Sequence, residues 1–86
     1  MEFYFSGTIE RIIFENPSSF FRILLLNIDD TDADFDDFEI IVTGTMADII
    51  EGEDYTFWGN LVQHPKYGEQ LKITRYERAK PTSKGL

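Results

Sequence analysis

The chain has 86 residues with a formal net charge of −8, and 8 Phe, 4 Tyr and 1 Trp make its composition strongly aromatic. A chain this short has room for one hydrophobic core, and its aromatic side chains are large enough to fill that core without metal or disulfide support. It contains no cysteine, which excludes disulfides, thiolate metal sites and thiol catalysis and indicates a reducing compartment.

Neither a secretion signal nor a membrane span is indicated. The first residues lack a basic segment followed by an apolar run, and no stretch approaches the roughly 18 apolar residues of a membrane-spanning helix. We therefore expect a cytoplasmic protein with no membrane partner.

The charges are distributed unevenly along the chain. Seven carboxylates gather between positions 29 and 39, namely Asp29, Asp30, Asp32, Asp34, Asp36, Asp37 and Glu39. From His64 onward the balance reverses, with six lysines and arginines against two glutamates. The molecule is thus polarised into an acidic middle and a basic C-terminal end.

Strand patterns dominate the chain. In residues 3–14, Phe3, Phe5, Gly7 and Ile9 lie on one face of the expected strand and the residues between them lie on the other. The internal Gly7 predicts a bulge or a sharp bend. A turn at residues 16–19 leads to a second strand at 20–28. The later segments are predicted as a loop at 29–37, a strand at 39–46, at most one helical turn within 47–54, a strand at 55–62, a hairpin connection at 64–68 and a strand at 70–78.

Five strands with short connections favour an all-β, five-stranded antiparallel barrel of the OB type, and an SH3-like barrel is the main alternative. We expect this domain to occupy residues 1–80, with residues 81–86 beginning a linker to domains that are absent from the chain. The side chains expected to point mainly inward are Phe5, Ile9, Ile23, Leu25, Val42, Phe57, Leu61, Leu71 and Ile73.

Motifs for catalysis are missing. There is no phosphate-binding G-x-x-x-x-G-K-[ST] loop, and His64 is a single histidine next to Pro65 in a predicted turn. The aspartate run fails the calcium-loop pattern, because a loop that starts at Asp30 has Phe35 in place of glycine and Ile41 in place of the final glutamate. We therefore predict no enzyme activity and no cofactor, and interpret the run as a solvated loop, with a weak cation site as the alternative.

Basic and aromatic residues predict contact with a nucleic acid. OB barrels bind single strands on the face of their second and third strands and through the loops after strands 1 and 4. Either Phe20 or Phe21, but not both, is expected to point outward, and Tyr67 is expected to stack on a base or to cover the open end of the barrel. The candidate nucleic-acid-binding residues are Arg22, Lys66, Tyr67, Lys72, Arg75 and Arg78.

Four segments carry a family resemblance: GTIERIIFEN at 7–16, IVTG at 41–44, EDYTFWG at 53–59 and HPKYGEQLK at 64–72. On the basis of these segments, the chain from about residue 3 to residue 85 resembles the N-terminal OB domain of RecD-like, YrrC-type DNA helicases. These helicases are relatives of the exodeoxyribonuclease V alpha chain. The aspartate-rich insertion departs from many members of that family, which puts in doubt DNA contact on the adjoining face.

The resemblance implies a non-catalytic accessory domain of a helicase that acts in DNA repair and recombination. It would contact single-stranded DNA or position it for motor domains beyond residue 86, where ATP and Mg²⁺ would bind. The alternative is a docking module that packs against the motor domains or a protein partner without touching DNA.

Overall fold

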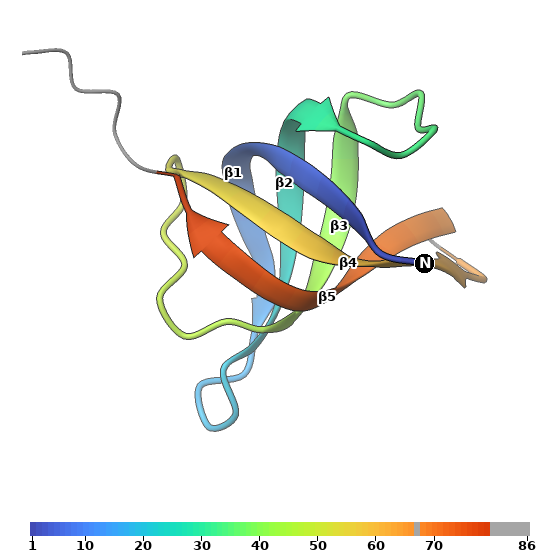
Figure 1. The fold of residues 1–86 in the computed structure, drawn as a ribbon. Coiled ribbons are helices and arrows are strands. Elements are labelled where there is room, and N and C mark those ends of the chain that lie inside the picture. The colour runs from blue at the N-terminus through green and yellow to red at the C-terminus, as the bar shows by residue number, and fades with distance from the viewer. Residues whose placement is uncertain (67, 80–86) are drawn as a thin grey trace, which may run out of the picture.

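Five strands close into a barrel in the computed structural model, which describes residues 1–66 and 68–79 (Figure 1). They are β1 (Phe3–Glu15), β2 (Phe21–Thr31), β3 (Glu39–Thr45), β4 (Asp54–His64) and β5 (Gly68–Arg78). Neighbours follow the order β1-β2-β3-β5-β4, and β4 pairs back onto β1. All pairings are antiparallel except β3 with β5, which is parallel.

This arrangement confirms the predicted all-β barrel and is consistent with an OB-fold. The described residues contain no helix, so the segment at 47–54 is a loop without the helical turn that the sequence allowed. It follows that no described helix is available to cross a membrane.

The predicted bend at Gly7 is present. The register between β1 and β2 shifts between Ser6 and Gly7, and a Cβ atom at position 7 would lie 1.9 Å from the backbone oxygen of Asn27. Only glycine permits such a close approach of the two backbones. The long strand β1 can therefore curve and pair with β2 on one side and β4 on the other.

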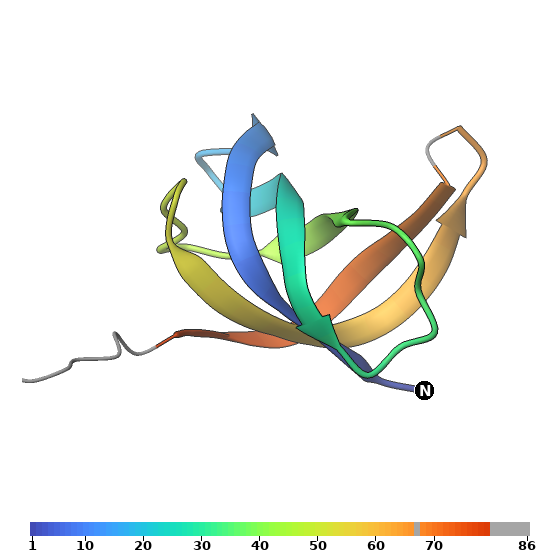
Figure 2. The same ribbon diagram turned by 90° about the horizontal axis from the view of Figure 1, so that it is seen from above.

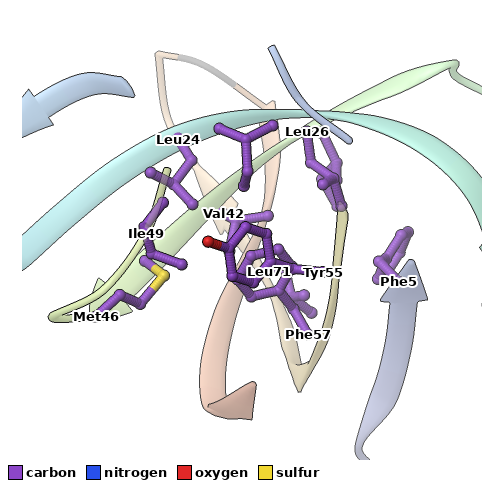
Figure 3. Close-up of a cluster of buried hydrophobic side chains, with 11 residues drawn as sticks. Phe5, Leu24, Leu26, Val42, Met46, Ile49, Tyr55, Phe57 and Leu71 are labelled. Atoms are coloured by element: carbon purple, nitrogen blue, oxygen red, sulfur yellow. The ribbon is translucent and has the colours of Figure 1, made fainter. Parts of the chain in front are cut away.

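Side chains from all five strands meet in one core (Figure 3). Strand alternation directs Phe5 and Ile9 of β1, and Tyr55 and Phe57 of β4, into the barrel, where their exposed fractions are 1% or less. The complete set of buried apolar residues is Phe5, Ile9, Leu24, Leu26, Ile40, Val42, Met46, Ile49, Tyr55, Phe57 and Leu71.

The predicted inward face of β2 was wrong by one residue. Leu24 and Leu26 are fully buried, whereas Ile23 and Leu25 are half-buried on the opposite face. The run from Ile23 to Leu26 is uniformly apolar, so it contains no polar residue that would mark the outer face. Leu61 and Ile73 are also only partly buried, but both pack against the core as expected.

The loop between β3 and β4 fills one end of the barrel. Met46 and Ile49 are buried there, and Figure 3 shows them together at one side of the core. The Tyr55 hydroxyl accepts a hydrogen bond from the Ile50 amide at 3.0 Å and donates one to the Asp48 carbonyl at 3.1 Å. Apolar burial and these hydrogen bonds together fix the loop, so a helix is not needed to cover the core.

The acidic segment is more ordered than its composition predicts. β2 continues through Asp29 and Asp30 to Thr31, so the predicted loop at 29–37 begins later, at residue 32. The Tyr4 amide donates to Asp32 at 2.9 Å, and the Tyr4 hydroxyl donates to Asp30 at 2.8 Å, which raises the pKa of Tyr4. Phe35 packs edge-on against Phe5 with ring centroids 5.4 Å apart, so the loop is anchored to the barrel.

The phase of β2 can be tested by truncating neighbouring leucines. We expect Leu24→Ala to lower the free energy of unfolding by about 2–5 kcal/mol, because it leaves a cavity in the core. Leu25→Ala removes the same atoms from a half-buried position and should cost clearly less. Urea unfolding measures both, and equal losses would contradict the observed phase.

A second substitution tests the close contact of β4 and β5. A Cβ atom at buried Gly59 would lie 2.1 Å from the Lys72 oxygen and 2.7 Å from the Ile73 Cα. We expect Gly59→Ala to destabilise the barrel by about 1–3 kcal/mol, because backbone atoms must move apart. The matched control is the exposed neighbour Asn60, whose change to Ala should stay within about 0.5 kcal/mol in the same unfolding assay.

Candidate nucleic-acid interface

A bulge in β5 brings two of the predicted cations to one face. Lys72 pairs with Asn60 and Arg75 pairs with Trp58, so one extra residue of β5 is inserted between the two pairs. Trp58 and Asn60 are two residues apart on β4, so their side chains lie on the same, outer face of the barrel. Their partners Arg75 and Lys72 therefore share that face. Without the extra residue, strict alternation would turn Arg75 to the side of buried Leu71.

Arg75 lies on an aromatic platform. Its guanidinium carbon is 3.8 Å from the centre of the Trp58 ring, which is a cation–π contact. Trp58 pairs on its other side with Tyr4 of β1. The Thr74 hydroxyl is 2.5 Å from a Glu2 carboxylate oxygen, so one acidic group adjoins this platform.

The residues Asn60, Lys72, Trp58 and Arg75 are called the cationic row below. Its two pairs are two residues apart along β4, which corresponds to about 7 Å. Lys72, Arg75 and Asn60 are exposed, and Trp58 is half-buried. Trp58 and Asn60 were not among the residues predicted from the sequence, although the alternation of β4 already placed them together on one face.

Lys66 lies at the end of the β4–β5 hairpin. It is exposed, and its amide donates a hydrogen bond to Nδ1 of His64 at 3.1 Å, which holds the turn. Tyr67 was predicted to be next to it as a stacking residue, but it lies outside the described residues. That prediction therefore remains a prediction from the sequence.

The other two predicted cations lie elsewhere. Arg22 is 9% exposed, and its Nη1 donates to the Ile49 carbonyl at 3.2 Å while its Nε lies 3.7 Å from a Glu15 oxygen. Arg78 forms an ion pair with Glu53 at 2.9 Å, and this hydrogen bond raises the pKa of Arg78. Arg22 thus binds the loop that closes the barrel, and Arg78 is already paired, so neither belongs to the cationic row.

The loop between β1 and β2 presents large apolar side chains. Phe20 and Phe21 are 45% and 37% exposed, so the expectation that only one of them points outward was wrong. Phe20 has a φ of 61°, an unusual conformation for an aromatic residue. Both of its backbone polar groups are hydrogen-bonded: the Phe20 amide donates to the Asn16 carbonyl, and the Phe20 carbonyl accepts from the Met46 amide. This left-handed backbone breaks the alternation and leaves both rings exposed.

Comparison with known proteins agrees with the fold. No solved structure matches the chain. A family model described as "ATP-dependent DNA helicase YrrC, OB-fold domain" matches residues 2–81. The match covers almost the whole chain and is to an OB-fold domain, which is not itself catalytic. The chain therefore belongs to the family of OB-fold domains of YrrC-type ATP-dependent DNA helicases.

Proposed function

We propose that this domain is a non-catalytic accessory module that contacts single-stranded DNA and positions it for the motor domains of a helicase. The observation that carries the proposal is the cationic row, in which Lys72 and Arg75 are exposed on one face beside Trp58. The family match supports the helicase context. In that context ATP and Mg²⁺ serve the motor domains, in the cytoplasm, and this domain needs no cofactor.

The chemistry of the cationic row suits a single strand. The Lys72 ammonium attracts phosphates without regard to sequence, and the Arg75 guanidinium, stacked on Trp58, offers a flat cationic surface for a base. Asn60 adds an amide that can donate or accept a hydrogen bond. Lys66 extends the positive charge to the hairpin turn. With about three phosphates neutralised, the log–log slope of affinity against salt is about −2 for a single strand.

A second candidate function is docking without DNA contact. Large apolar side chains are exposed at the β1–β2 end of the barrel: Ile13 at 45%, Phe14 at 49%, Phe20 at 45% and Phe21 at 37%. Such a patch is typical of a surface that packs against another domain. The motor domains of the same helicase are the proposed partner.

The DNA proposal is tested by titrating labelled single-stranded oligothymidylate with the domain and its variants at two salt concentrations. Arg75→Ala should weaken binding by about 1–3 kcal/mol, because a base loses its stacking surface. Lys72→Ala should weaken binding to all sequences alike and flatten the salt slope by about 0.7. Fluorescence anisotropy measures both effects, and the single tryptophan, Trp58, reports contact by a change in its own fluorescence.

The matched control is Arg78→Ala, which removes the same charge from the same strand at a residue already paired with Glu53. It should bind almost like the unchanged domain. If all three variants lose affinity equally, the strand is held by overall charge and the cationic row is not a site. If none loses affinity while the Phe14→Ser variant no longer associates with the motor domains, the docking function replaces the DNA function.

A further inference from the structure

A groove with an acidic rim lies on another part of the barrel. It has a volume of about 930 Å³ and runs between the β2–β3 loop and the β4–β5 hairpin. Both ribbon views place these two segments on the same side of the molecule (Figures 1 and 2). Leu25, Phe38 and Ile41 supply apolar surface, and Asp37, Glu39 and Glu69 supply carboxylates. These six residues define the acidic groove.

The charge of the acidic groove is unsuitable for DNA. Among the described residues that line it there is no lysine or arginine. Glu39 shares a hydrogen bond with Glu10, and this bond and the like charge raise the pKa of Glu39, although Arg11 nearby opposes the shift and Asp37 adds to it. The neighbouring carboxylates Glu10 and Asp37 thus add negative charge around Glu39, which repels phosphates and attracts cations.

Phe38 gives the groove an exposed aromatic side chain on a backbone that is held in place. Phe38 is 83% exposed, the highest value among the aromatic residues of the described barrel. Its carbonyl accepts a hydrogen bond from the Ile28 amide at 2.7 Å, and Phe35 three residues earlier packs on Phe5. The side chain therefore projects from an anchored loop, so little ordering entropy is lost when a partner covers it.

The backbone beside the groove is available for strand addition. Pairing between β3 and β5 begins at Ile41 and Gln70. The preceding residues, Glu39–Ile40 of β3 and 68–69 of β5, pair only with β2 and β4 on their far sides. The two strands separate here and turn hydrogen-bonding edges toward the groove, and such edges accept an extended chain.

We propose that the acidic groove binds an extended segment of a protein partner in which lysine or arginine alternates with apolar side chains. Apolar side chains of the segment pack on Phe38, Leu25 and Ile41, and its cations meet the three carboxylates of the rim. Along β5, Glu69 shares the face of Leu71 while Lys72 lies on the opposite face. The groove and the cationic row thus use different faces of the hairpin, so one domain can hold a basic protein and a single strand of DNA.

The test uses three short fluorescein-labelled peptides with the unchanged 86-residue chain. One alternates lysine with valine, the second alternates glutamate with valine, and the third alternates lysine with serine. We expect saturable binding of the first peptide and at least about tenfold weaker binding of the other two, because each lacks one half of the complementarity. Backbone NMR should show slower amide exchange at Ile40 or Glu69 when the peptide is bound.

Two pairs of variants locate the site. Phe38→Ser should weaken binding of the lysine–valine peptide about tenfold, while Ile50→Ser, which changes an exposed apolar residue outside both the groove and the β1–β2 patch, should not. Glu69→Gln should weaken binding and reduce its salt dependence, while Glu77→Gln on the same strand should not. All four positions are exposed, so folding should be preserved.

Several results would overturn the proposal. These are absence of peptide binding, equal binding of the glutamate–valine peptide, groove variants that bind like the unchanged domain, or loss of oligothymidylate binding in Phe38→Ser and Glu69→Gln. The last result would assign the groove to DNA. Loss of DNA binding in the cationic-row variants with peptide binding intact would instead support two separate sites, so the two proposals fail independently.

Discussion

The pairing between β3 and β5 is the contact on which the barrel depends. It consists of three residue pairs, Ile41 with Gln70, Val42 with Leu71 and Thr43 with Lys72. Without it β3 and β5 would both be sheet edges, and the side chains of Val42 and Leu71 would lose the neighbours that bury them completely. Because the two segments are far apart in sequence, the contact forms only when the intervening chain is already folded back. The shortness of this seam also leaves the strands apart at one end, where the acidic groove lies.

Two irregularities in the strands, the bulge in β5 and the close approach at Gly7, determine which side chains are exposed and how the strands pair. The extra residue in β5 follows Ile73, which faces the core by regular alternation; it returns Tyr76 to the core side and turns Arg75 outward onto Trp58. On β1, Gly7 allows the backbone to approach Asn27 so that the strand can serve two neighbours. Without the bulge, the guanidinium of Arg75 would point into the barrel, where its desolvation would destabilise the fold. The exposure of the cationic row therefore depends on the bulge.

The sequence predicted the strands well because alternation and turn residues are local signals, and both are strong here. It failed where the local signal was absent or misleading. The uniformly apolar run in β2 concealed its inner face, and Arg22 took an inward position because a loop carbonyl, that of Ile49, lies within reach in the folded barrel. The aspartates around Phe35 predicted a solvated loop, and the sequence did not indicate that Phe35 packs on Phe5, which is distant in sequence. Trp58 became part of the candidate site only through its pairing with Arg75, which alternation along either strand alone does not reveal.

The strongly negative charge of the domain confines the proposed DNA contact to the face on which Lys72 and Arg75 are exposed. Carboxylates adjoin that face as well, because Glu2 bonds Thr74 and Asp30 bonds Tyr4, the neighbour of Trp58. An acidic middle repels a phosphate backbone from most orientations, and the row on β4 and β5 presents a face on which that repulsion is locally offset. Exposed charges act over about 8 Å at physiological salt, so the offset is confined to nearby phosphates. In the proposed function, this arrangement would keep affinity low and restrict the orientation of a bound strand. Those are useful properties for an accessory domain, because a strand that moves through a motor must be guided without being held.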